Sequence, residues 1–136
     1  NSPVTQMEGY DHLRGVTPRG WQKGRTWDEV AGLYNPKTRE VLAGNGKHGS
    51  SSLILHETGH AIGHALEYDE SPALVEHHKR LHGKLSPYLK QGGPGALAGR
   101  QELLAEGIAD VCMRPSTARR IYDDGFVDWI EQVVLR

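Results

Sequence analysis

The chain has 136 residues, of which 16 are basic and 17 acidic, so its formal net charge is -1. This balance gives no electrostatic reason to expect nucleic acid or an anionic membrane as the main partner, and no apolar run approaches the roughly 20 residues that a membrane-spanning helix needs. The length fits one soluble domain over residues 1–136, and the single cysteine, Cys112, excludes a disulfide within the chain.

The first 26 residues show no clear hydrophobic period. Glycine and proline recur through them, so we expect a less regular segment over residues 1–26. The chain starts at Asn1 without a methionine or a charged and apolar leader. Such a start is expected of a mature or excised piece of a longer polypeptide.

A β-hairpin is predicted within "TWDEVAGLYNPKTREVLAG", residues 26–44. Its centre, "NPKT", is a turn sequence with proline at the second position. Apolar residues lie on both sides of this turn, at Val30, Leu33, Tyr34, Val41 and Leu42.

From Ser50 the hydrophobic spacing becomes helical. Apolar residues recur at spacings of three, four and seven, at Leu53, Ile54, Ala61, Ile62, Ala65 and Leu66. The three serines at positions 50–52 are candidates for the N-cap.

Further helices are predicted towards the C-terminus. Ser71 is the expected N-cap of one, with Pro72 at its first helical position and an end near Leu85. Others are expected over residues 100–113, over residues 116–122 with Ser116 as cap, and over residues 126–135. Because the strands precede the helices, the predicted fold class is α+β, mainly α.

Residues 56–60, "HETGH", form the pattern H-E-x-x-H on the first predicted helix. Residues four apart on an α-helix differ by about 40° around its axis, so His56 and His60 can bind one ion from the same face. Glu57 projects about 100° from His56 and can act on a water at the ion's open position. Because a catalytic zinc site takes three protein ligands and a water, we expect one Zn²⁺ with Glu57 as general base.

The third zinc ligand must come from elsewhere in the chain, because two histidines alone hold zinc poorly. His64 lies one turn beyond His60, but a rigid helix cannot easily wrap three turns around one ion. The metzincin pattern H-E-x-x-H-x-x-G-x-x-H ends on a third histidine, and this chain has Leu66 followed by Glu67 there. His64 therefore remains only an alternative ligand or a neighbour of the site.

The stretch "RQELLAEGIAD" offers carboxylates at Glu102, Glu106 and Asp110, spaced four apart on one stripe. A solvated acidic face is the simplest interpretation of such a stripe. The stripe borders an apolar helix in which uncompensated charge would be costly to bury. Two assignments therefore stay open, in which Glu102 binds the metal and Glu106 orients a histidine, or Glu106 binds and Asp110 orients.

"HETGHAIGHAL" followed by "ELLAEGIADV" resembles the gluzincin metallopeptidases, in particular the domain shared by anthrax lethal factor and the clostridial Pro-Pro endopeptidases. The resemblance covers roughly residues 27–136 and implies a zincin-like fold. It also implies that Glu102 is the third ligand and that Glu106 lies behind the ligands. An extended peptide would then pair with the strand at Val41 to Ala43.

One position departs from this family's pattern. The family places a tyrosine seven residues before the ligand glutamate, where it stabilises the oxyanion, and this chain has Gly95 there. Tyr88 on the same glycine-rich connection is the predicted replacement. His77, His78 and His82 are further candidates.

The resemblance implies a zinc endopeptidase, secreted or delivered into a target cell as a bacterial toxin or effector domain, with a peptide or protein as substrate. The alternative is a non-catalytic module of the same fold that binds a metal or a peptide. A third interpretation, a small helical interaction domain with an accidental motif, predicts no metal. Glu57 favours catalysis, because a structural zinc site would be expected to have a fourth protein ligand instead.

Overall fold

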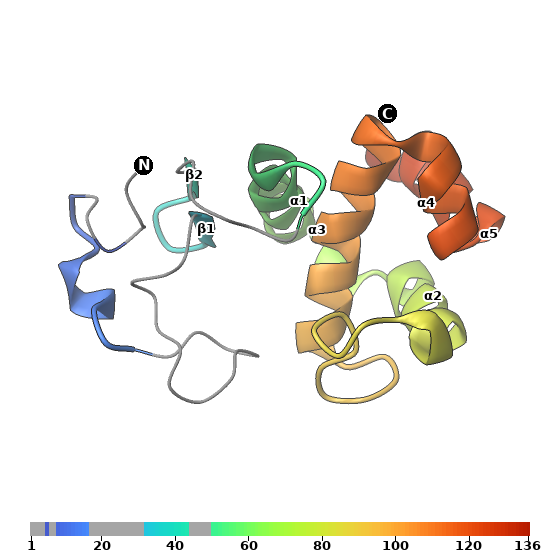
Figure 1. Ribbon diagram of the computed structural model, residues 1–136, viewed down its shortest axis with the longest axis horizontal. Helices are drawn as coiled ribbons and strands as arrows, with labels where there is room; N and C mark the ends of the chain where they lie inside the picture. Colours follow the sequence, from blue (N-terminus) through green and yellow to red (C-terminus); the bar gives the residue numbers. More distant parts are fainter. Residues whose placement is uncertain (1–4, 6–7, 17–31, 44–49) are drawn as a thin grey trace.

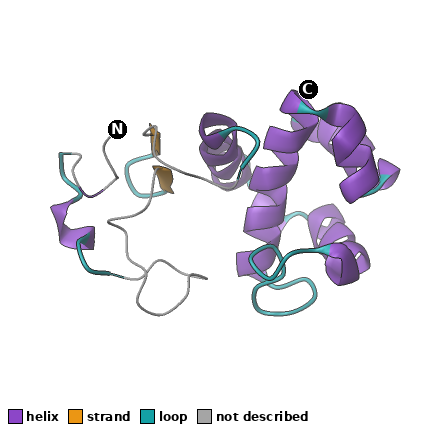
Figure 2. Ribbon diagram, viewed as in Figure 1, coloured by secondary structure: helices purple, strands orange, loops and turns teal. Residues whose placement is uncertain are grey.

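The computed structural model describes residue 5 and residues 8–16, 32–43 and 50–136, and its strands precede its α-helices (Figures 1 and 2). The described elements are β1 (Gly32–Asn35), β2 (Glu40–Ala43), α1 (Leu53–Ala65), α2 (Pro72–Leu81), α3 (Leu97–Met113), α4 (Pro115–Ile121) and α5 (Asp124–Trp129). The predicted α+β class, mainly α with a small hairpin before the H-E-x-x-H helix, is therefore confirmed.

The N-terminal expectation concerns residues that the structure describes only in part. Residues 1–4, 6–7 and 17–31 lie outside the described residues. Within residues 8–16 the chain forms a short 3-10 helix at Asp11–Leu13. The hydroxyl of Tyr10 accepts a hydrogen bond from Asn35 at 3.2 Å, which ties this segment to the hairpin.

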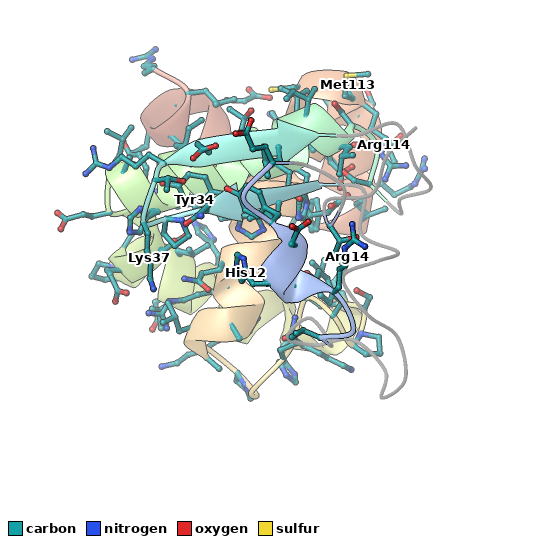
Figure 3. The ribbon with its side chains drawn as sticks, turned by 90° about the vertical axis from the view of Figure 1, so that its left-hand side faces the viewer. His12, Arg14, Tyr34, Lys37, Met113 and Arg114 are labelled. Carbon is teal, nitrogen blue, oxygen red and sulfur yellow. The ribbon has the colours of Figure 1, made fainter. Side chains whose placement is uncertain are left out.

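The hairpin forms where the turn sequence predicts it. β1 and β2 pair antiparallel, with Gly32 opposite Ala43 and Asn35 opposite Glu40. The Asn35 side chain accepts a hydrogen bond from the backbone N–H of Lys37 at 3.0 Å, as expected of an Asx turn. Figure 3 looks onto the hairpin from the N-terminal side and shows both strands in front of α1, against which they pack.

Helix α1 starts after Ser52, one of the three predicted caps, whose hydroxyl accepts a hydrogen bond from the Leu55 N–H. Its buried face differs from the face that the apolar spacing indicated. Ile54 and Leu66 are 53% and 62% exposed. The buried residues of α1 are instead His56, Glu57, Gly59 and Gly63. The helix therefore turns a polar, small-residue face inwards.

Helix α3 is the centre of the hydrophobic core. Leu103, Leu104 and Ile108 on this helix are at most 1% exposed, and they belong to one cluster with Phe126 and Ile130 near the C-terminus. Figure 1 shows α3 between α1 on one side and α4 and α5 on the other. In the described part of the chain, no helix combines the length and the apolar character needed to cross a bilayer.

Four predicted helices have corrected bounds, and the one expected over residues 100–113 starts earlier, at Leu97. The helix that starts at Pro72 ends at Leu81 and passes into a 3-10 turn at His82–Lys84, short of Leu85. Helix α4 starts with Pro115 at its first position and Arg114 as cap, so Ser116 is not the cap. Proline suits the first position of a helix because the N–H it lacks would have no partner within the helix there. The last predicted helix is α5 followed by a π-helical turn at Ile130–Val134.

Helices α1 and α3 approach closely at Gly59. A Cβ atom on Gly59 would lie 2.7 Å from the Cα atom and 3.1 Å from the carbonyl oxygen of Ala105. Backbone atoms cannot yield as a flexible side chain can. Glycine is thus required on α1 for the α3 backbone to pass at this distance.

Gly59→Ala should separate the two helices and destabilise the protein. Overpacking typically costs about 1–3 kcal/mol, which exceeds the roughly 1 kcal/mol that alanine gains over glycine in a helix. Denaturant unfolding measures the change. Gly83→Ala is the matched control, because nothing lies within 4 Å of its added Cβ. A Gly59→Ala protein as stable as the parent would contradict the steric argument.

Candidate active site

His56 and His60 on α1 and Glu102 on α3 converge at the helix crossing. The Glu102 Oε1 atom lies 2.9 Å from His60 Nε2 and 3.3 Å from His56 Nε2. Each of the three residues offers a ligand atom, and these atoms lie within 4.8 Å of one another. Within the described ranges, this is the one group of three or more histidine, cysteine or carboxylate residues that converges in this way.

The donor set and its spacing fit a zinc ion. Two ligand atoms that each lie about 2.0–2.1 Å from a tetrahedral ion are about 3.3 Å apart. The separations around Glu102 Oε1 are close to this value. Two imidazoles and one carboxylate also match the ligand types of catalytic zinc sites, which leave a fourth position for water.

Glu106 lies on the far side of one imidazole. Its Oε2 atom is 2.7 Å from His56 Nδ1, whereas Glu102 approaches the Nε2 atom of the same ring. A carboxylate on Nδ1 fixes the ring orientation and keeps Nε2 directed at the ion. Glu106 is therefore placed to orient His56.

Glu57 lies beside the cluster and is 6% exposed. Burial raises the pKa of its carboxyl, although the positive charges of His60 and His56 act in the opposite direction. A raised pKa brings a carboxyl closer to the range in which it both accepts and returns a proton near neutral pH. Its position and its pKa both suit a general base.

The charges of the cluster are coupled. Burial by itself would lower the pKa of His56, but the hydrogen bonds to Glu102 and Glu106 outweigh it and raise that pKa to about 10. For Glu102, burial acts upwards, and the hydrogen bonds to His56 and His60 outweigh it and hold its pKa below the ordinary value. Without a metal, His56 is thus a cation held between two carboxylates.

Asp110 belongs to a different network. Its carboxylate accepts hydrogen bonds from Ser51 at 2.8 Å, Tyr122 at 2.6 Å and Arg114 at 3.0 Å. These partners join the start of α1 to the ends of α3 and α4. Asp110 therefore stabilises the helix arrangement and does not contact an imidazole through these bonds.

His64, Tyr88 and Gly95 complete the set of predicted residues. His64 is exposed, and a hydrogen bond of 3.0 Å links its Nδ1 atom to the Tyr34 hydroxyl on β1. Tyr88 is 36% exposed and lies on the connection before α3. Gly95 on the same connection has φ +75, and a Cβ there would lie 3.0 Å from the Lys79 side chain. A tyrosine at position 95 would consequently be strained.

The three histidines of the α2 region have other partners. His78 is fully buried, donates from Nε2 to the Leu89 carbonyl at 2.7 Å and accepts from the Gly95 N–H at 2.8 Å. His77 packs against the rings of Phe126 and Trp129. His82 lies near the His78 ring, with centroids 6.1 Å apart.

Sequence reasoning did not identify the partners of Asp110 or the link between Tyr34 and His64. It also did not single out Asp69, which is 6% exposed and lies beside Gly63. The one feature of the sequence that indicated a close contact here is Gly63, because a glycine permits a close neighbour. The identity of that neighbour depends on a chain reversal that no local pattern specifies.

A family model described as anthrax toxin lethal factor, N- and C-terminal domain, matches residues 1–91, which include the H-E-x-x-H motif and end before α3. The Pro-Pro endopeptidase of Clostridioides difficile (strain 630) is 42% identical over 72 residues, 50% of this chain and 33% of that protein. The Pro-Pro endopeptidase of Paenibacillus alvei is 45% identical over 63 residues, 43% of this chain and 29% of that protein.

The fold is also similar to a solved structure. The structure of the Pro-Pro endopeptidase from Paenibacillus alvei superposes with a TM-score of 0.68 at 23% identity, covering 97% of this chain and 74% of that chain. The matched segments of the two curated relatives are only about a third of those proteins in length.

Zinc affinity should rise with pH, because the ion binds a neutral imidazole and must displace the proton of His56. With a His56 pKa of about 10 in the metal-free chain, the affinity should increase about tenfold per pH unit between pH 6 and 8. Calorimetric titration in buffers of different ionisation enthalpy counts the released protons. His12→Ala, which removes an exposed histidine elsewhere, should leave the count unchanged. Binding without proton release would contradict the charge assignment.

Proposed function

Because the chain belongs to the family of the anthrax toxin lethal factor domain, we propose that it is a zinc-dependent endopeptidase. The observation that carries this proposal is the convergence of His56, His60 and Glu102, with buried Glu57 beside them. The names of the two Pro-Pro endopeptidases support a peptidase in particular.

In this proposal one Zn²⁺ is held by His56, His60 and Glu102, and Glu106 orients His56. The distances favour this assignment over the alternative in which Glu106 binds the ion and Asp110 orients a histidine. Glu106 approaches Nδ1 of His56, the ring atom that faces away from Glu102. Asp110 is engaged with Ser51, Arg114 and Tyr122.

The proposed reaction is hydrolysis of a peptide bond. A bound zinc ion supplies Lewis acidity, which lowers the pKa of a bound water to about 7 and polarises the carbonyl of the substrate. Glu57 accepts a proton from that water while the oxygen of the water attacks the carbonyl carbon. The same carboxyl then gives a proton to the amine that leaves when the C–N bond breaks.

The substrate is proposed to be an extended peptide that pairs with β2 beside α1, through backbone hydrogen bonds. The names of the relatives make a bond between two prolines the first sequence to test. The left-handed backbone at Gly95 disfavours the tyrosine of the family pattern at that position. Tyr88, on the same connection, is proposed to donate to the oxyanion in its place. The name of the matching family supports a secreted or delivered toxin or effector.

The alternative function is a non-catalytic module that binds a metal or a peptide on the same fold. Binding of a metal or a peptide alone does not require a buried carboxyl that can accept a proton beside the metal ligands. The position of Glu57 is therefore the specific observation that favours the enzyme.

Glu57→Gln should keep bound zinc and lose most peptidase activity, because the amide has the same shape but accepts no proton. Loss of a general base typically lowers the rate by about 10²–10⁴-fold. Zinc content by elemental analysis and cleavage of a peptide library that includes Pro-Pro sequences test this. Equal activity in variant and parent would rule out Glu57 as the base.

Glu102→Ala should lose more zinc affinity than Glu106→Ala. Removal of a group that only orients a ligand typically costs about 10–100-fold in metal affinity, and removal of a ligand should cost more. Competition with a chelating dye gives both constants. The reverse order of the two variants would move the ligand assignment to Glu106.

A further inference from the structure

A pocket lies beside the candidate zinc site. The end of α1, the following turn with its 3-10 helix at Tyr68–Glu70, and α3 border an open hollow of about 190 Å³. It is lined by Gly63, His64, Glu67, Asp69, Glu70 and Gln101. Three of these six residues are acidic, and none is a lysine or an arginine.

Asp69 is the buried acid of this pocket. Its side chain lies against Gly63, where a Cβ atom would collide with Oδ1. Asp69 is 6% exposed, and its Oδ1 atom has no hydrogen-bond partner among the described residues. Burial raises the pKa of the carboxyl, while the charge of His60 and a hydrogen bond with Gln101 lower it. A buried acceptor without a donor is rare in folded proteins and indicates a missing partner.

The arginine in this corner is engaged elsewhere. Arg100 donates to the backbone carbonyls of Asp69 and Gly95, each at 2.7 Å, and pairs with Glu70 Oε2 at 3.2 Å. None of these bonds reaches the Asp69 carboxylate or Glu67. The pocket thus keeps an excess of negative charge after Arg100 is counted.

The pocket adjoins the candidate zinc ligands along both helices. His64 lies one helical turn beyond His60 on α1, and Gln101 directly precedes Glu102 on α3. A group bound beside Asp69 would therefore lie next to the proposed scissile bond. This places the pocket within reach of the side chains that flank that bond.

The chemistry favours an organic cation over a second metal ion. Within the described residues, the ligand atoms of three or more such groups converge only at His56, His60 and Glu102. The acids of the pocket do not meet at one point in this way. A guanidinium or ammonium group on a long side chain can instead bond to separate carboxylates with its several N–H groups.

We propose that this pocket binds the positively charged side chain of an arginine or lysine in the peptide substrate, with Asp69 and Glu67 as its acceptors. The inference rests on the proposed peptidase function and adds a preference for substrates with a basic residue near the cleaved bond. The shared feature of the two side chains is a charged N–H donor at the end of a long apolar stem.

The first test measures binding without cleavage. Nα-acetyl-arginine amide and its neutral isostere, Nα-acetyl-citrulline amide, are titrated into the zinc-loaded chain, and the backbone NMR signals of Gly63, Glu67 and Gln101 are followed. The arginine compound should bind about tenfold more tightly, as expected of a charge-assisted hydrogen bond. Asp69→Asn and the exposed Glu67→Gln should each reduce this ratio, so a folding defect of one variant leaves the other as a test. Glu76→Gln removes an exposed acid of α2 outside the pocket and should keep the ratio.

The second test measures cleavage of peptide pairs in which arginine or citrulline occupies each position in turn. One position should show about a tenfold preference for arginine in kcat/KM, and that preference should fall in Asp69→Asn and Glu67→Gln. Equal binding of arginine and citrulline amides would overturn the pocket inference even if peptides are cleaved. Preferential binding with no cleavage of any peptide would overturn the endopeptidase proposal and the substrate assignment, but not the cation site.

Discussion

The candidate site depends on the close approach of α1 and α3 at Gly59 and Ala105. Neither helix alone can form a three-ligand site, because α1 supplies two imidazoles and α3 supplies the carboxylates. Glu102 lies three residues before Ala105, so the contact that sets the helix separation also sets the distance from its carboxylate to the histidines. A change of a few tenths of an ångström at Gly59 is therefore transmitted to the proposed metal ligands.

The polar face of α1 is buried, which is costly unless its groups are paired. Here His56 lies between Glu102 and Glu106, and His60 lies against Glu102. Those pairs compensate the buried charges of the metal-free chain. Ile54 on α1 and Leu66 directly after it remain exposed and contribute little to the core. The apolar core is therefore formed mainly by α2, α3 and the C-terminal helices.

The sequence predicted the elements of this arrangement better than their contacts. The hairpin, the order of the helices and the pairing of His56 with His60 follow from turn chemistry and from the helical repeat, which are local. The choice between Glu102 and Glu106 is not local, because both lie on one stripe and the crossing of two helices decides which one meets the ring Nε2 atoms. Asp69 was missed for the same reason, since its contact with Gly63 arises only after the chain turns at Glu67, which has φ 62.

Electrostatics couples the candidate zinc site to the neighbouring acidic pocket. A zinc ion brings two positive charges and displaces at most one proton from each of the two imidazoles, so the loaded site is at least as positive as the metal-free cluster. This charge lies near His60, and a positive charge at His60 lowers the pKa of Asp69. A positive charge kept there favours the ionised form of Asp69. Metal loading would thus keep the pocket anionic, so that recognition of a basic side chain and the presence of the reactive ion support each other.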